Sequence, residues 1–164
     1  MSKNNKYYKM QEITIEYERR FILKDFPNDF DTYKKSRIEQ WYLTKPDNPV
    51  SIRIRRYDDG RCYFDVKKGF GMEREKIGNK HEFKDIEIYT KNAYPMQKDR
   101  YKKHHDDYLM IIDIFDDGLK LIEIESKNKD VIQNFQPLDW FGEEVTNNIE
   151  YTNNYIAYDN YLKH

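Results

Sequence analysis

Charged residues alternate with apolar residues inside segments that have the period of a β-strand, and this pattern constrains the fold more than any other. In residues 11–24, Glu16, Glu18 and Arg20 occupy every second position, and most positions of the other face are apolar or aromatic. Because successive side chains of a strand point to opposite faces, these three charged groups share one face. A chain with 36% charged residues ordinarily keeps those residues on its solvent-exposed surface.

The same alternation recurs along the chain and predicts a mainly β protein. Eight strands are expected, over residues 11–24, 37–44, 50–57, 61–67, a segment that starts at 73, 95–104, 108–115 and 119–126. The sequence Asp-Asp-Gly at 58–60 and at 116–118 is typical of a hairpin turn. Helical spacing predicts short helices over 82–92 and 129–136 and an amphipathic helix over 147–163.

The charged faces of these strands together carry seven acids and six bases. They are Glu16, Glu18, Glu73, Glu75, Asp113, Glu123 and Glu125, with Arg20, Arg53, Arg55, Lys67, Lys98 and Arg100. For one strand, the ordinary interpretation is a charged face in water and an apolar face in the core. This interpretation weakens when six or more strands repeat the pattern, and eight antiparallel strands can instead close into a barrel with the charged face inward. We therefore expect a mainly β (α+β) fold: an eight-stranded closed barrel, helices packed outside and a C-terminal helix.

A lumen lined by charges of both signs favours a particular class of ligand. Buried charges without partners cost several kcal/mol each, so such a lumen needs compensation. A polyphosphate offers many oxygens to Arg and Lys, and Arg binds them in a bidentate manner. Carboxylates are the preferred ligands of hard divalent cations. The residue types thus indicate a small-molecule triphosphate or nucleotide held together with a metal ion.

Several segments resemble the strands of one known family. Residues 16–21 (EYERRF) resemble its Glu-x-Glu-x-Lys strand, residues 38–43 its second strand, and residues 51–55 (SIRIR) its paired-arginine strand. Lys67, with the Gly-rich turn after it, stands where the family has a lysine on the fourth strand, and residues 98–101 (KDRY) resemble the Lys-x-Arg strand. Residues 112–115 and 121–125 match the last core strands, and residues 140–146 (WFGEEVT) match the segment before the C-terminal helix. In this order, over almost the whole chain, they resemble the CYTH superfamily, the triphosphate tunnel metalloenzymes. The likeness is closest to small bacterial inorganic triphosphatases.

The resemblance implies a metal-dependent phosphohydrolase acting on inorganic triphosphate or a related linear triphosphate. Arg20, Arg53, Arg55, Lys67, Lys98 and Arg100 would bind the phosphates. Mg²⁺ or Mn²⁺ would be held by acids from the set Glu16, Glu18, Glu73, Glu75, Asp113, Glu123 and Glu125. Glu16, Glu18 and Lys67 would be the catalytic residues. A covalent intermediate is not needed, since phosphoryl transfer depends mainly on positioning and electrostatics.

Two features of the chain depart from the family pattern. Arg20 stands where the family usually has Lys, which keeps the charge and changes the donor geometry. The register of Glu73 and Glu75 stays open, because the span from Lys67 is short. If Arg74 is instead the family's basic residue, the positions that follow on its face are Lys76 and Gly78, which are not acids.

Other functions remain as alternatives. A class IV adenylyl cyclase, or a nucleoside or thiamine triphosphatase, would use the same tunnel. A protein that binds a phosphorylated nucleotide without turnover would use the bases alone. Product analysis and binding measurements separate these alternatives.

Composition excludes several classes of protein. Lys and Arg number 29 and Asp and Glu 30, and this net charge of −1 argues against a binder of duplex nucleic acid. No apolar run is long enough to span a membrane, and the N-terminal segment lacks the apolar stretch of a secretory signal. With 164 residues and no internal repeat or linker, residues 1–164 are expected to form a single cytoplasmic domain.

Two motifs invite a functional interpretation that their spacing does not favour. Cys62 is the only cysteine, so it forms no intramolecular disulfide, and without a histidine in register it is interpreted as an inert strand residue. Residues 104–107, His-His-Asp-Asp, are interpreted as a solvated loop, because adjacent residues rarely converge on one ion.

Overall fold

The structure is a computed structural model, and it describes residues 12–164. The N-terminal segment, from which the absence of a secretory signal is predicted, lies outside the described residues. In the part of the chain that the structure describes, no helix has the length and apolar character needed to cross a membrane.

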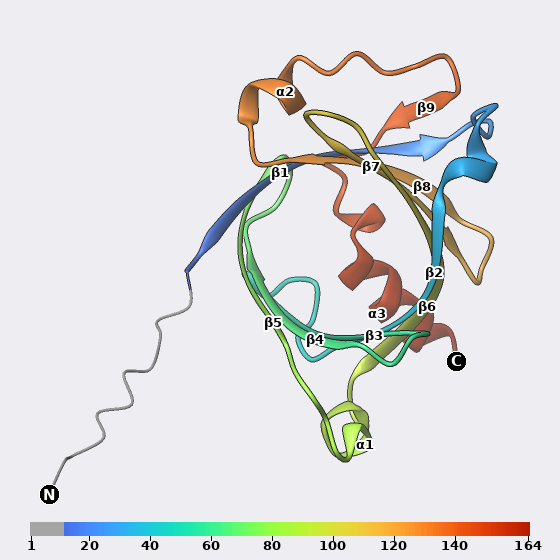
Figure 1. Ribbon diagram of the computed structural model, residues 1–164. Helices are drawn as coiled ribbons and strands as arrows, with labels where there is room; N and C mark the ends of the chain where they lie inside the picture. Colours follow the sequence, from blue (N-terminus) through green and yellow to red (C-terminus); the bar gives the residue numbers. More distant parts are fainter. Residues whose placement is uncertain (1–11) are drawn as a thin grey trace, which may run out of the picture.

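The strands form one antiparallel sheet that closes on itself (Figure 1). The strands are β1 (Thr14–Leu23), β2 (Lys34–Tyr42), β3 (Val50–Tyr57), β4 (Cys62–Lys68), β5 (Glu73–Lys80), β6 (Tyr94–His104), β7 (Leu109–Phe115), β8 (Lys120–Ser126) and β9 (Phe141–Glu144). Their order is β5-β4-β3-β2-β6-β7-β8-β1-β9, and β5 also pairs with β1. This last pairing closes eight strands into a barrel and leaves β9 as an added strand beside β1.

Three α-helices and two short 3₁₀ turns complete the fold within residues 12–164. The helices are α1 (Ile86–Thr90), α2 (Lys129–Gln133) and α3 (Asn153–Lys163), and the turns are η1 (Phe30–Thr32) and η2 (Ile149–Tyr151). Both predicted Asp-Asp-Gly turns are present, with φ of +85° at Gly60 and +92° at Gly118. Glycine adopts this left-handed conformation without the steric cost that a Cβ would add.

Apolar side chains form two buried clusters, one on each side of the barrel wall. On the outside, Phe21, Ile112 and Ile122 pack with residues of α2 and β9. On the inside, Met96, Phe115 and Leu121 pack with Ile156 and Ala157 of α3. Since these inner residues lie toward one end of their strands, α3 fills that end of the barrel, and in Figure 1 it lies within the ring of strands. The charged part of the lumen therefore begins above α3.

The predicted fold class is confirmed, with differences at the ends of elements. β2 begins at Lys34, before the expected residue 37, and the C-terminal helix begins at Asn153 rather than 147. β9 was not predicted, because its four residues carry no alternation and it forms only through pairing with β1. The prediction of helices outside the barrel holds for α2, whereas α3 packs against the inner face.

Candidate active site

Strand register brings the charged pairs of the sequence together across the lumen-facing wall. Glu18 on β1 is the direct partner of Glu125 on β8, and Arg20 is the partner of Glu123. On the other side of the barrel, Arg53 on β3 faces Asp65 on β4. Direct partners have Cβ atoms about 4.5–5.5 Å apart, so the register alone fixes which charges meet.

These side chains surround a cavity of about 590 Å³, a volume typical of small-molecule sites. Its lining has nine basic residues, namely Arg20, Arg53, Arg55, Lys67, Lys68, Arg74, Lys76, Arg100 and Lys102. The acidic residues of the lining are Glu18, Asp47, Glu123 and Glu125. The excess of positive charge makes the cavity complementary to a small polyanion, although the whole chain is almost neutral.

Three carboxylates converge at the acidic part of the cavity. Oxygens of Glu18, Glu123 and Glu125 all lie within 4.8 Å of one another, and this is the candidate metal-binding group found within residues 12–164. Burial and the neighbouring carboxylates of Glu123 and Glu18 raise the pKa of Glu125. Glu125 forms no ion pair among the described residues. Three carboxylates that converge in this way, one of them without an ion pair, offer the oxygen ligands that a hard divalent cation prefers.

Arg20 ties two of these carboxylates to the C-terminal segment. Its Nη2 donates to Glu18 Oε1 and Glu123 Oε1, each at 2.9 Å, and its Nη1 donates to the Tyr151 carbonyl oxygen at 2.9 Å. Its pKa is raised, because the attraction of Glu123 and Glu18 outweighs the effect of burial. The planar guanidinium reaches three acceptors at fixed angles, which an ammonium cannot do with the same geometry.

Asp65 holds the paired arginines of β3. Its Oδ2 accepts from Arg53 Nε at 2.9 Å and lies 3.2 Å from Arg55 Nη2. Despite burial, Arg53 and Arg55 lower the pKa of Asp65 to about 2. Gly78 on β5 is its cross-strand partner, and a Cβ at Gly78 would lie 2.5 Å from Asp65 Oδ1. The missing side chain at position 78 is thus what makes room for this carboxylate.

Gly78→Ala is expected to destabilise the protein by about 1–3 kcal/mol, because the new methyl group displaces the Asp65 carboxylate from Arg53. Chemical denaturation measures the effect. Gly60→Ala is an informative comparison: a Cβ at Gly60 would have no atom within 4 Å, and the φ of this residue is positive, so the cost there is conformational only. Wild-type stability of Gly78→Ala would contradict the close approach.

Lys98 and Arg100 share Asp113 below the cavity. Lys98 Nζ donates to Asp113 Oδ2 at 2.7 Å and to Asn153 Oδ1 of α3 at 3.1 Å. Arg100 donates to both oxygens of Asp113, at 2.7 and 2.6 Å. Burial and the charge of Arg100 lower the pKa of Lys98 to about 7. Lys98 is 0% exposed and does not line the cavity, so its ammonium is a buried ion-pair partner here.

Glu16 is held between two lysines. Its two oxygens accept from Lys67 Nζ and Lys76 Nζ, both at 2.9 Å. These lysines overcome the effect of burial and lower the pKa of Glu16 to about 2. Both lysines line the cavity, and Glu16 does not.

Some donors around the cavity have no acceptor within residues 12–164. The buried Nε atoms of Arg55 and Arg74 have no hydrogen-bond partner. Burial and the charge of Arg53 lower the pKa of Arg55. Buried donors of this kind cost free energy unless an acceptor satisfies them, and phosphate oxygens are suitable acceptors.

Comparison with known proteins identifies the family. No family model matches the chain. The inorganic triphosphatase of Nitrosomonas europaea is 31% identical over 149 aligned residues, which cover 87% of this chain and 96% of the relative. The chain belongs to the CYTH superfamily. The match spans nearly the full length of that relative, so the likeness concerns the whole barrel and not one motif.

Solved structures agree with this assignment. A crystal structure of an inorganic triphosphatase has a TM-score of 0.60 and 28% identity, covering 87% of this chain and 93% of its own. A putative adenylate cyclase from Vibrio parahaemolyticus has a TM-score of 0.55 over 74% of this chain and 82% of its own. Since that structure is only 12% identical, its likeness concerns the fold of the CYTH barrel.

The structure of this CYTH protein brings most of the predicted site residues into one cavity. The predicted bases that line it are Arg20, Arg53, Arg55, Lys67 and Arg100, and the predicted acids that line it are Glu18, Glu123 and Glu125. Lys98 and Asp113 pair with each other on the inner face of the barrel, below the cavity, and Glu16 lies behind its two lysines.

Glu73 and Glu75 do not point into the barrel. The register of β5 pairs Arg74 with Glu16 and Lys76 with Thr14, which places Arg74 and Lys76 on the lumen face. Both glutamates are exposed, and Glu73 lies 3.8 Å from Lys129 outside the barrel. The expectation that they face the lumen is wrong, and the alternative register, with Arg74 inside, is the observed one. A strand of alternating acids and bases has no apolar face from which its register can be chosen.

Sequence reasoning did not select Lys102 as a cavity residue, and it left Arg74 and Lys76 as an alternative register. It also missed Asp65, which does not line the cavity but pairs with Arg53 and Arg55. Asp65 and Lys67 share one face of β4, so the alternation already contained the signal for Asp65. Lys102 continues the Lys98 and Arg100 face of β6 by one more step of two residues. Arg74 and Lys76 required the pairing of β5 with β1, which the sequence does not show.

Proposed function

We propose that this CYTH protein hydrolyses inorganic triphosphate, or a related linear triphosphate, in the charged cavity with Mg²⁺ or Mn²⁺ as the cofactor. The observation that carries the proposal is a cavity with nine basic residues around one group of three converging carboxylates. The name and near full-length similarity of the Nitrosomonas europaea relative support the same activity.

Basic side chains from several strands would bind the phosphate oxygens. Arg53 and Arg55 of β3 and Arg100 of β6 already have their guanidinium groups oriented by Asp65 and Asp113. A donor that is held in place before substrate binds does not have to be ordered during the reaction. The Nε of Arg55, which has no hydrogen-bond partner among the described residues, can also donate to a phosphate oxygen.

Glu18, Glu123 and Glu125 would hold the divalent cation. Such an ion, when bound, neutralises charge on bridging and terminal phosphate oxygens and lowers the pKa of bound water. The three glutamates would hold this ion beside the arginines, and Arg20 sets the orientation of two of them through its bonds to Glu18 and Glu123. The chain's own contribution to rate is therefore alignment and charge neutralisation.

Release of phosphate from tripolyphosphate, with Mg²⁺, with Mn²⁺ and in EDTA, tests the proposal. We expect turnover with at least one metal and none in EDTA. Absence of turnover with either metal would overturn it. Parallel reactions with ATP separate the alternatives, because cyclisation releases pyrophosphate, hydrolysis releases phosphate, and a binding protein leaves the nucleotide intact.

Lys102 is expected to make tripolyphosphate binding dependent on pH. Lys102 lines the cavity and forms no ion pair among the described residues. Burial and the positive charges of Arg100 and Arg55 lower its pKa to about 8, because together they outweigh the opposing effect of Glu125 and Asp113. Below that pH the ammonium attracts the polyanion; above it the neutral amine does not. Binding is therefore expected to weaken as pH rises through about 8.

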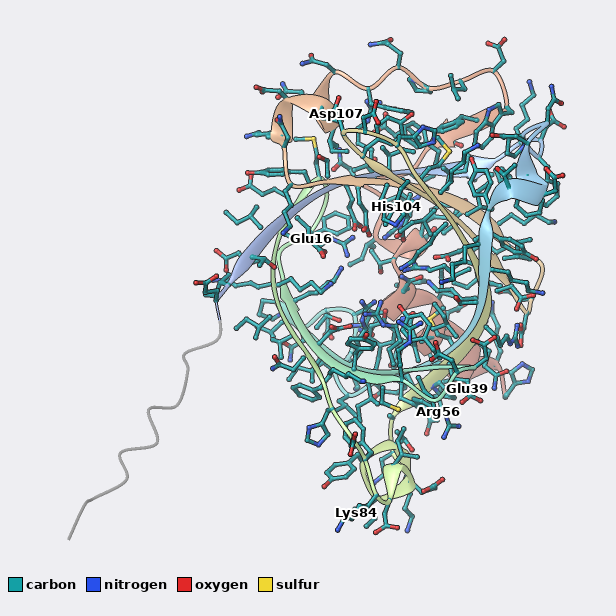
Figure 2. All side chains as sticks on the ribbon, viewed as in Figure 1. Glu16, Glu39, Arg56, Lys84, His104 and Asp107 are labelled. Atoms are coloured by element: carbon teal, nitrogen blue, oxygen red, sulfur yellow. The ribbon has the colours of Figure 1, made fainter. Side chains whose placement is uncertain are left out.

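Calorimetry of tripolyphosphate binding in EDTA, at a series of pH values, measures this effect. Lys102→Met is expected to remove the step near its pKa and to bind more weakly at neutral pH. Lys84→Met is the control, because Lys84 is exposed between β5 and α1, far from the ring of strands (Figure 2). The same pH step in Lys102→Met and in the wild type would contradict the assignment.

A further inference from the structure

We infer that Lys76 is a substrate-binding residue that acts as a pair with Lys67, and that Glu16 is the counter-ion of this pair and not a metal ligand. The inference rests on the proposed function and assigns residues within that site. It predicts that each chain binds one divalent cation, held by Glu18, Glu123 and Glu125.

The two lysines are direct cross-strand partners. In the register of β4 with β5, Lys67 lies opposite Lys76. Like charges directly opposite each other on adjacent strands are destabilising, so an arrangement of this kind requires a compensating anion. The carboxylate of Glu16 bridges both ammonium groups, at 2.9 Å from each. One negative and two positive charges leave the cluster of Lys67, Lys76 and Glu16 with a net positive charge.

The positive groups stand on the cavity side of this cluster. Lys67 and Lys76 line the cavity, with side-chain exposures of 12% and 23%, whereas Glu16 does not line it. Figure 2 shows Glu16 on β1 at the barrel wall. A polyanion that enters the cavity therefore meets two ammonium groups before it meets their carboxylate. Arg74, the neighbour of Lys76 on the same strand face, adds an unpartnered Nε.

The same contacts remove Glu16 from the set of metal ligands. A divalent cation at Glu16 would have to displace both lysines and would be repelled by them at short range. Glu18 lies on the same face of β1, two residues further along, where it contacts Arg20 and Arg74 and converges with Glu123 and Glu125. Since the cation is expected at that cluster alone, the two lysines supply the positive charge that a second ion would otherwise provide.

Substrate binding without metal tests the role of Lys76. Tripolyphosphate is titrated calorimetrically, in EDTA, into the wild type, Lys76→Met and the matched control Lys84→Met. Loss of one charge-assisted contact is expected to weaken binding by about tenfold or more in Lys76→Met, and Lys84→Met is expected to bind as the wild type does. Lys76→Arg, which keeps the charge, should recover most of the affinity. Circular dichroism verifies that each variant is folded.

Mn²⁺ binding, followed by electron paramagnetic resonance without substrate, tests the role of Glu16. The expected result is one Mn²⁺ per wild-type chain, unchanged affinity in Glu16→Gln, and affinity lowered about tenfold or more in Glu18→Gln. Two bound ions in the wild type, or equal losses in the two variants, would overturn the inference. So would unchanged tripolyphosphate binding in Lys76→Met.

These outcomes are distinct from a failure of the proposed function. A wild type that hydrolyses tripolyphosphate while Lys76→Met binds it normally would overturn only the assignment of Lys76. A wild type that neither binds nor hydrolyses tripolyphosphate would overturn both.

Discussion

Glu18→Gln is expected to lower the rate of tripolyphosphate hydrolysis by roughly 10²–10³-fold, the usual cost of removing one preorganised charged contact. The substitution keeps the size of the side chain and an oxygen acceptor for Arg20 and Arg74, but removes one of three anionic metal ligands. Raising the Mg²⁺ or Mn²⁺ concentration should therefore restore part of the activity. Steady-state rates over a range of metal concentrations measure both effects.

Two further variants make this result specific. Arg55→Ala removes a phosphate contact, so its activity should fall without rescue by metal. Glu39→Gln is the matched control for Glu18→Gln, because Glu39 lies on the outer side of the barrel in an ion pair with Arg56 at 2.5 Å (Figure 2). Surface substitutions of this kind usually change stability by less than about 0.5 kcal/mol. Wild-type activity in both Glu18→Gln and Arg55→Ala would show that the cavity is not the site of reaction.

Asp113→Ala is expected to lower the free energy of unfolding by about 3–5 kcal/mol, because it leaves buried charges without a partner. Asp113 is 1% exposed and is the shared acceptor of Lys98 and Arg100, which are 0% and 5% exposed. Lys98 can lose its proton in response, since its pKa is already lowered to about 7, whereas Arg100 stays charged. For a domain of this size the melting temperature should fall by about 2–4 °C for each kcal/mol.

Asp116→Ala is the control for this variant. Asp116 also pairs with an arginine, Arg37, but its side chain is 54% exposed, and exposed pairs contribute about 0–1 kcal/mol. Urea denaturation of both variants measures the difference. Equal stability of the two would contradict the assignment of Asp113 as the counter-ion of Lys98 and Arg100.

The prediction of β3 and the errors on β5 show what a strand pattern can convey. In β3, Ile52 and Ile54 alternate with Arg53 and Arg55, so the apolar face fixes which arginines point the other way. In β5, the sequence EREKIGNK has charges on both faces, and shifting it by one residue exchanges Glu73 and Glu75 for Arg74 and Lys76. Only the hydrogen-bonded pairing with β1 and β4 chooses between these registers.

The contacts of α3 could not be predicted for a different reason. The sequence indicates an amphipathic C-terminal helix, but an apolar helix face fits the outside of a barrel as well as an open end of it. The structure places Ile156 and Ala157 against Met96, Phe115 and Leu121, at inner positions of the strands. This contact closes one end of the lumen and brings Asn153 to Lys98. The choice depends on the shape of the assembled barrel, which no local pattern contains.

The sequence by itself determined the eight strands of the barrel, the two Asp-Asp-Gly turns and most of the charged residues that line the cavity, because side-chain alternation has a period of two in any β-strand. Only the tertiary structure decided which charges meet. It pairs Glu16 with two lysines, Asp113 with Lys98 and Arg100, and leaves Glu18, Glu123 and Glu125 to converge. These pairings follow from strand register and from closure of the sheet, which bring together residues far apart in the sequence, such as those of β1 and β8. Coulomb interactions over a few ångströms then set the role of each charged group.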